Sequence, residues 1–254
     1  MNNLAALRLQ IEWGADEALQ DQPSDRFAPP PPPLASMPAT TPRATKPAVV
    51  KPPHPSPAVS PETAPDLATL QQALDAFHAC PLRATASTTV APSGNPAAGF
   101  VVIAEAPGPD DDRAGHAFSG PPGQRLDRIL ATAGLDRTNL LLAMLVPWRP
   151  PGGRPLNELE INQCLPFLHR LLVLAPPRHL VLLGATPLRA IGNDPAATLR
   201  RARGRWIPAT IPGLEAPIPA LAMLPPDQWL ASAQNKQSTW NDLLLIRDAL
   251  ASSR

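Results

Sequence analysis

The sequence is poor in residues that would place it in several common protein classes. Its 254 residues include no tyrosine, and aromatic side chains make up only 4% of them. Two cysteines, Cys80 and Cys164, are too few for a disulfide framework. No run of about eighteen apolar residues is present, so no membrane-spanning helix is expected. The segment Met1–Leu19 carries several charges and no apolar run, so we expect no secretory signal and a cytoplasmic protein.

The chain also lacks an excess of charge of either sign. It carries 22 lysines and arginines against 21 aspartates and glutamates, a formal net charge of +1 at pH 7. Proteins that coat nucleic acid without regard to its sequence are usually far more basic. The composition argues against such a protein but is compatible with a local basic strip. It gives no sign of an oligomer, so a monomer is expected.

Proline is abundant. Many of the 37 prolines lie in Ala28–Pro65, where few apolar residues are available to bury. Such a segment cannot offset the entropy lost on ordering, so a disordered, polyproline-like linker is expected. Ahead of it, apolar residues recur at helical spacing in Met1–Gln20, which predicts an amphipathic helix. The predicted organisation is a helix at residues 1–20, a linker at 21–65 and one folded domain at 66–254. The helix packs on the domain or binds a partner protein, and the linker is a second candidate for partner binding.

Four short apolar runs in the domain are typical of buried parallel strands: Phe100–Ala104, Leu140–Val146, His179–Leu183 and Ile218–Leu224. Helical periodicity predicts helices at Asp66–Phe77, with Asp66 as N-cap, Gly123–Ala133, Glu158–Ala175, Thr186–Ile191 and Thr239–Ala251. The alternation predicts an α/β fold: a single three-layer domain with a central parallel sheet of about four strands and helices on both faces. Such sheets bind ligands in the loops at the carboxyl ends of their strands.

The loop Ala104–Gly123 is the strongest candidate for a ligand site because it follows the first predicted strand. Glu105 stands at the strand end, and Pro107–Gly108 turns the chain sharply. Phe118 is an aromatic residue in an otherwise polar loop, and two glycines near the loop's end permit a ligand to approach the main chain. The alternative is a polar surface loop whose acidic run, Asp110–Asp112, faces water.

A series of short motifs runs through nearly the whole domain, from Cys80 to Leu250. The motifs are Cys80-Pro-Leu-Arg, Gly94-Asn-Pro, Glu105-Ala-Pro-Gly108, Gly115 with Phe118 and Gly120, Gly123-Gln, Leu126-Asp127, Gly134-Leu-Asp-Arg137, Trp148-Arg-Pro-Pro-Gly152, Cys164-Leu-Pro-Phe167, Leu182-Leu-Gly184, Arg203-Gly-Arg-Trp206 and Lys236 with Trp240. In this order and spacing, the domain resembles the family-four uracil-DNA glycosylases. The N-terminal helix and Pro-rich linker are similar to one bacterial branch of that family.

The resemblance implies a DNA repair protein that flips uracil out of DNA and hydrolyses its N-glycosidic bond. DNA containing uracil would then be its partner. Phe118 would stack on the base, and the main chain around Ala106, Pro107 and Gly108 would contact the base edge. Glu105 would face the sugar or orient water. The alternatives are Phe118 as a core residue beneath the loop and Glu105 as a cap of the following helix.

Two positions depart from the family pattern, both in the expected base pocket. The family has an asparagine that reads the polar edge of uracil where this chain has Met144. It has a histidine that stabilises the departing uracil anion where this chain has Pro225. Neither side chain replaces the lost hydrogen bond, and removing one such donor typically costs about 10²–10³ in rate. The sequence therefore leaves two hypotheses: a glycosylase with reduced activity, or a DNA-binding relative that has lost the reaction.

Two other side chains are candidates to supply the missing chemistry. His116 lies shortly before Phe118, and we consider it as the catalytic imidazole; its alternative role is a solvated loop residue. Asp227 follows the altered motif, either as a new acid or as a turn residue after two prolines.

The resemblance also raises the question of a metal cofactor, because many members of that family hold a four-iron cluster with four cysteine thiolates. Cys80 and Cys164 stand at ligand-like positions, Trp148 occupies a third, and the fourth has no candidate. Two thiolates cannot hold that cluster, so no metal and no cofactor are expected. Trp148 and its apolar surroundings are expected to fill the space instead.

Basic side chains in two loops are candidates for contact with DNA phosphates. They are Arg149, Arg154, Arg200, Arg201, Arg203 and Arg205. The alternative for the second group is a solvated basic turn with Trp206 in the core. Trp229 and Leu230 are expected to wedge into the space that a flipped base leaves in the duplex.

Overall fold

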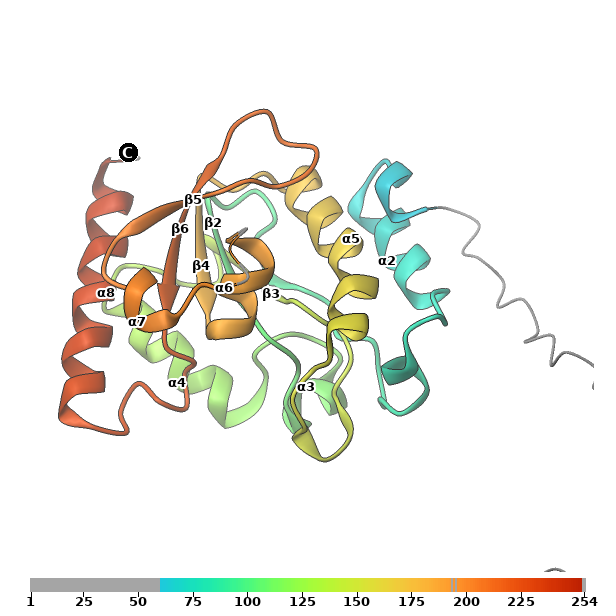
Figure 1. Cartoon of the computed structure of the whole chain (residues 1–254), viewed down its shortest axis with the longest axis horizontal. Helices are drawn as coiled ribbons and strands as arrows, with labels where there is room; N and C mark the ends of the chain where they lie inside the picture. Colours follow the sequence, from blue (N-terminus) through green and yellow to red (C-terminus); the bar gives the residue numbers. More distant parts are fainter. Residues whose placement is uncertain (1–59, 193, 195, 253–254) are drawn as a thin grey trace, which may run out of the picture. The chain divides into compact units, whose positions relative to one another are not determined.

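The computed structural model describes residues 60–192, 194 and 196–252 (Figure 1). The predicted helix at 1–20 and nearly all of the predicted linker lie outside this range. The described chain opens with a 3-10 helix, η1 (Pro61–Thr63), and the following Ala64 is fully buried. Arg170 donates a hydrogen bond to the carbonyl of Ala64, with Nε 2.8 Å from the oxygen. The packed domain therefore begins a few residues before the predicted boundary at 66.

A six-stranded sheet forms the middle layer, in the order β1-β3-β2-β4-β6-β5. The four inner strands run parallel: β3 (Leu140–Met144), β2 (Phe100–Ala104), β4 (His179–Leu183) and β6 (Ile218–Met223). They are the four predicted strands, so the predicted parallel sheet is confirmed. The sequence pattern does not predict the two antiparallel edge strands, β1 (Ser93–Gly94) and β5 (Trp206–Ala209). β5 contains Pro208, which cannot donate to a ladder and is tolerated at a sheet edge.

Helices cover both faces of the sheet, as predicted. α2 (Leu67–Asp75) and α5 (Glu158–Leu174) pack on one face, and α4 (Gly120–Ala131) and α8 (Ala233–Ser252) pack on the other. Three short helices complete the fold: α3 (Pro109–Ala114), α6 (Ala185–Ile191) and α7 (Leu199–Ala202). The predicted cap of the first long helix is confirmed, because the Asp66 carboxylate accepts a hydrogen bond from the Thr69 N–H at 2.7 Å. No described helix is both long and apolar enough to cross a membrane.

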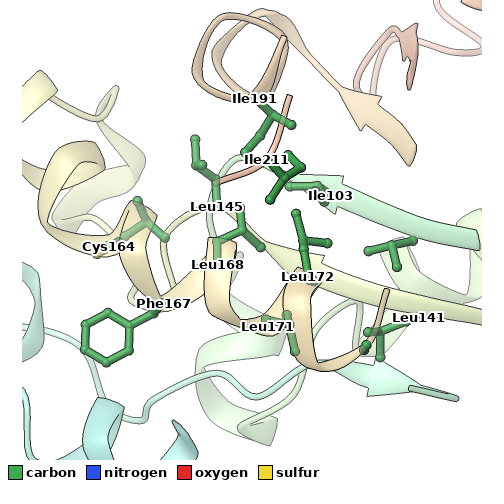
Figure 2. Packing of buried hydrophobic residues seen from close by; sticks show 14 of the residues in the cluster. Ile103, Leu141, Leu145, Cys164, Phe167, Leu168, Leu171, Leu172, Ile191 and Ile211 are labelled. Atoms are coloured by element: carbon green, nitrogen blue, oxygen red, sulfur yellow. The ribbon is translucent and has the colours of Figure 1, made fainter. Parts of the chain in front are cut away.

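Each central strand contributes alternate residues to two separate cores, as the period of a strand requires. Val101 and Ile103 of β2 belong to the core beneath α2 and α5, whereas Phe100 and Val102 belong to the core beneath α4 and α8. Figure 2 shows the first of these cores, where side chains of α5 such as Leu172 lie against the sheet. Because β2 is buried along its whole length, its carboxyl end is a rigid base for the loop that follows.

Candidate functional site

A pocket of about 470 Å³ opens at the carboxyl ends of the four parallel strands. Every one of these strands contributes to it: Ala104 ends β2, Met144 ends β3, Leu183 ends β4, and Pro225 follows β6. The carboxyl edge of a doubly wound sheet is where ligands of such folds bind. The loop Ala104–Gly123 supplies most of the remaining lining residues.

This pocket brings together most of the residues that the sequence assigns to the base. The predicted residues that line it are Glu105, Ala106, Gly108, Phe118, Met144 and Pro225. Pro107 does not line the pocket; it is buried in the turn behind it. Residues from four separate places in the chain therefore meet at one sheet edge.

The loop contains the short helix α3, and a buried carboxylate fixes its geometry. Asp111 has only 8% of its surface exposed. One of its oxygens accepts a hydrogen bond from the N–H of Gly108 at 2.8 Å, and the other accepts one from the N–H of Ser119 at 2.6 Å. Asp111 therefore joins the segments of the loop Ala104–Gly123 that precede and follow α3. Asp111 is not among the predicted site residues, although Pro109 at the first helical position and an acid shortly after it are helix-start signals.

The neighbouring Asp112 is buried too. Its carboxylate accepts hydrogen bonds from the N–H groups of Ser87 and Thr88, at 2.9 and 3.2 Å. The alternative in which the acidic run faces water is therefore wrong for Asp111 and Asp112. Asp110 is partly exposed, lines the pocket and forms an ion pair with Arg113 at 2.5 Å.

Phe118 is held in a conformation that non-glycine residues rarely adopt. Its φ of 55° makes it the only non-glycine residue with positive φ in the described part of the chain. The carbonyl of Phe118 accepts a hydrogen bond from Arg137 Nη2 at 2.6 Å, and the same guanidinium pairs with Asp127 at 3.1 Å. Gly123 leaves room for this carbonyl, since a Cβ there would lie 1.8 Å from its oxygen. Such strain persists only where the surroundings enforce it, and it is typical of ligand sites.

The ring of Phe118 belongs both to the second core and to the pocket wall. It is 8% exposed and packs with the apolar residues beneath α4 and α8. Its placement is compatible with stacking on a ligand as well as with its alternative role as a core residue.

Glu105 follows β2 and is half-buried at the pocket. Its main-chain carbonyl accepts a hydrogen bond from the Val146 N–H at 3.1 Å, which continues the pairing of β2 with β3. The alternative role as a helix cap is wrong, because Gly108 is the N-cap residue of α3 and its N–H is bound by Asp111. Within the described residues the Glu105 carboxylate has no ion-pair partner. Its charge is therefore not neutralised before a ligand binds.

The ends of β3 and β6 present apolar side chains to the pocket. Met144 is 8% exposed, and Pro225 is half-buried. In the strand order β3-β2-β4-β6 they lie on either side of the ends of β2 and β4. Beyond Pro225, Asp227 lies in a turn and also lines the pocket rim, so its turn position is as predicted.

His116 does not reach the pocket, contrary to its prediction as a catalytic group. Its side chain is exposed, and Nδ1 lies 2.7 Å from the hydroxyl of Ser119. A β-bridge to Ala91 fixes the backbone of His116. The pocket is therefore lined by no imidazole among the described residues.

The predicted DNA-contacting arginines fall into two groups. Arg200 and Arg201 are exposed on α7, whose first residue, Leu199, lines the pocket; Arg205 is exposed just after this helix. Arg149 is half-buried. Arg200 and Arg201, which directly follow the pocket residue Leu199 and have no ion-pair partner among the described residues, therefore place positive charge next to the pocket.

Arg203 and Arg154 have structural partners instead. The side chain of Arg203 is 15% exposed and pairs with the buried Asp242 at 2.6 Å. Burial raises the pKa of Asp242, and Arg203 opposes that rise. Arg154 pairs with the buried Glu160 at 2.5 Å, and this hydrogen bond lowers the pKa of Glu160. The prediction that these two arginines bind phosphate is corrected, because their charges are already compensated within the fold.

Trp229 is also misassigned by the sequence. It is fully buried, and its indole Nε1 donates to the Leu224 carbonyl at 2.6 Å, so it holds the turn after β6 and cannot wedge into DNA. Leu230 beside it is 60% exposed. Trp206 lies half-buried at the start of β5, with its ring 4.9 Å from that of His179.

The two cysteines meet beneath α5 in the first core. Cys80 and Cys164 are each 1% exposed, and a hydrogen bond between their thiols lowers the pKa of Cys80 to about 7 and raises that of Cys164. Trp148 is fully buried and stacks on Phe77 with ring centres 6.2 Å apart. A four-iron cluster needs four thiolates, and the whole chain has two cysteines, so these residues do not fit that group.

Comparison with known proteins agrees with the geometry of the pocket. Residues 91–244 match the family described as the uracil DNA glycosylase superfamily. The chain is 32% identical over 126 residues to the type-4 uracil-DNA glycosylase of Pyrobaculum aerophilum. These residues make up 50% of this chain and 64% of that relative. It is 30% identical over 129 residues to that of Thermotoga maritima, covering 51% and 67%. For Archaeoglobus fulgidus the identity is 34% over 114 residues, covering 45% and 57%.

Proposed function

Because the chain belongs to the uracil-DNA glycosylase superfamily, we propose that it binds DNA, extrudes a uracil into the pocket and hydrolyses the N-glycosidic bond at a reduced rate. One observation carries the proposal. The loop after β2 places Glu105 and the ring of Phe118 in one pocket at the carboxyl edge of the sheet. The superfamily's chemistry requires a closed site for a flipped base of this kind.

The polar side of the pocket suits the sugar. Breaking the bond between C1′ of the sugar and N1 of uracil leaves positive charge on the sugar and negative charge on the base. The carboxylate of Glu105 would stabilise the first of these charges and orient the water that attacks C1′. The products are free uracil and an abasic site, and the proton of the water neutralises the departing base.

Phe118 would stack on the extruded base. Base–aromatic stacking is tolerant of base identity, since every base has a π-face. Its strained backbone, held by Arg137 and given room by Gly123, keeps the ring in place before the ligand arrives. Preorganisation of this kind reduces the cost of binding.

The apolar strand ends are why we propose a reduced rate. Pro225 cannot stabilise the uracil anion, and loss of such a donor costs about 2.7–4 kcal/mol of the barrier. Met144 cannot pair with the polar edge of uracil, so the pocket loses the hydrogen bond that discriminates most strongly between bases.

A second candidate is a DNA-binding relative that no longer catalyses the reaction. It is favoured by a specific observation: no described residue that lines the pocket is a histidine, and His116 is exposed and hydrogen-bonded to the hydroxyl of Ser119. This candidate keeps the DNA surface at Arg200 and Arg201 and the base pocket, but not the hydrolysis.

The two candidates are separated by alkali cleavage of a labelled oligonucleotide that carries one uracil, single-stranded and in duplex. We expect slow excision by the wild type and none by Glu105→Ala or Phe118→Ala. Glu158→Ala and Leu159→Ala are the matched controls, because both residues are exposed on α5. These variants should excise uracil like the wild type. Absence of excision by the wild type, with DNA binding retained, would establish the second candidate.

A further inference from the structure

The first half of α8 carries an exposed tryptophan that the proposed chemistry does not use. Trp240 is 52% exposed, and Lys236 lies one helical turn before it on the same face. Among the described residues, three large apolar side chains are exposed: Leu159, Leu230 and Trp240. Two of these three, Leu230 and Trp240, line a single groove. Scattered exposed apolar residues need no explanation, but a gathered pair does.

The groove has a volume of about 450 Å³ and lies between α4, α8 and the turn that precedes α8. Ile129 of α4 and Thr132, the C-cap residue of α4, form one side, and Lys236 and Trp240 of α8 form the other. The buried Trp229 also lines the groove. The groove is therefore mostly apolar, with the exposed side chain of Trp240 and the ammonium group of Lys236 on the same side.

One short turn contributes to both the groove and the base pocket. Asp227 and Gln228 of this turn line the pocket, and Trp229 and Leu230, which follow them, line the groove. The turn is held rigidly, because Asn235 of α8 donates from Nδ2 to the Gln228 carbonyl at 2.9 Å. The pocket and the groove therefore share one rigid turn, four residues of which line one or the other.

The charge around the groove is positive. Within the described residues Lys236 has no ion-pair partner. Arg125 and Arg128 are exposed on α4 at the three- and four-residue spacings that place them on the face of Ile129 and Thr132. Of the nearby acids, Asp127 is paired with Arg137 and Asp242 with Arg203. Asp227, in the turn between the pocket and the groove, has no ion-pair partner among the described residues, but the three basic side chains outnumber it.

We propose that this groove is a second nucleotide site, which binds an unpaired base of the DNA next to the extruded one. The base would stack on Trp240 beside Leu230, and its phosphate would pair with Lys236. An aromatic face with a neighbouring cation is the arrangement by which proteins hold single-stranded nucleic acid without reading its sequence. The inference rests on the proposed function only in that the ligand is DNA; it does not require that the pocket catalyses hydrolysis.

The test is the affinity of the full-length protein for a fluorescent single-stranded oligonucleotide without uracil, measured by anisotropy. Trp240→Ala is expected to weaken binding by about five- to 150-fold, the range for loss of one stacked base, whereas Trp240→Phe should retain most of the affinity. Lys236→Gln should reduce the slope of log affinity against log salt by about 0.7, the value for one phosphate contact on a single strand. Leu159→Ala is the matched control, because Leu159 is about as exposed as Trp240 but does not line the groove. This variant should bind like the wild type.

The outcomes also separate this inference from the proposed function. Excision of uracil by a protein whose Trp240→Ala variant binds single strands like the wild type would overturn the second site and leave the glycosylase intact. Binding that depends on Trp240 in a protein that excises nothing would sink the glycosylase and support the second site. Equal binding by the wild type, Trp240→Ala and Lys236→Gln would show that the groove takes a different occupant, such as a protein, and would overturn the inference.

Discussion

The pocket joins two regions of opposite character. The loop after β2 is polar and held together by hydrogen bonds. Asp111 accepts from the N–H groups of Gly108 and Ser119, and Arg137 donates to the carbonyl of Phe118. The ends of β3 and β6 are apolar at Met144 and Pro225. Met144 and Pro225, the apolar strand ends, thus face the polar pocket loop, Ala104–Gly123.

The difference shows that the shape of a site and its chemistry can be lost separately. The pocket loop builds its shape from buried hydrogen bonds, so a change there disturbs the fold as well as the site. The apolar strand ends need no hydrogen-bond partner, so polar groups are dispensable there for folding. In the proposed function, the pocket loop stacks on the base and stabilises the sugar, whereas the strand ends lie where the base edge would be read. A protein of this kind would keep the pocket without the groups that read the base.

The largest effect is expected from making the apolar strand ends polar. Pro225→His combined with Met144→Asn supplies an imidazole for the base anion and an amide for the polar edge of uracil. The rate of excision should rise by about 10²–10³ for the imidazole alone, since that is the cost of removing one such donor. Single-turnover cleavage of a uracil-containing strand measures this rate.

Pro219→His is the matched control for that experiment, because Pro219 is exposed on β6 and lies outside the pocket. It should leave the rate unchanged. A folded double variant that excises no faster than the wild type would show that the contrast between the two regions does not limit the reaction.

The next largest effect is expected in the pocket loop. Asp111→Ala leaves the half-buried N–H of Gly108 and the buried N–H of Ser119 without an acceptor, and the buried one alone costs about 1–3 kcal/mol. The free energy of unfolding from urea denaturation should fall accordingly, and excision should fall with it because the loop ends separate. Asp110→Ala is the control: this partly exposed carboxylate pairs with Arg113, and its loss should cost at most about 1 kcal/mol. Equal losses in the two variants would contradict the assignment of Asp111 as the positioning residue.

The sequence predicts the fold well because its strands are continuous apolar runs and its helices keep a clear period. The four central strands and the cap at Asp66 follow from these local patterns alone. The edge strands escape prediction because β1 is only two residues long and β5 contains a proline. The pocket is predictable from the ends of the strands, since parallel strands bring their carboxyl ends to one edge.

The errors in the site have a common physical cause. A charged or aromatic residue in a turn looks exposed in a sequence, and its partner lies far along the chain. Arg203 meets Asp242 from the last helix, and Asp112 meets Ser87 and Thr88. Trp229 is buried because the turn folds back on Leu224. Motif order identifies which residues gather at the pocket, but only tertiary contacts tell which polar residues support the fold.

The smallest effect concerns a buried carboxylate outside the pocket, which sharpens the comparison with Asp111. Glu160 is 1% exposed and is held by Arg154, a side-chain cation, in addition to the N–H of Asn157. The hydrogen bond from Arg154 lowers the pKa of Glu160. The stability that this shift contributes is therefore present above the unfolded pKa, about 4.3, and is lost as the pH falls through the lower folded value.

Arg154→Met should lower the thermal midpoint at neutral pH. Its difference from the wild type should narrow as the pH falls below about 4.3, because the wild type loses the stability of the Arg154–Glu160 pair as Glu160 takes up a proton. Thermal unfolding of both proteins between neutral and acidic pH measures this difference. Affinity for DNA should be unchanged, because Glu160 already compensates the charge of Arg154. Arg149→Met, at a half-buried arginine with no ion-pair partner among the described residues, provides the comparison and should show no such pH dependence of its stability. A difference that stays constant with pH, or a loss of DNA affinity in Arg154→Met, would return Arg154 to the DNA surface that the sequence predicts.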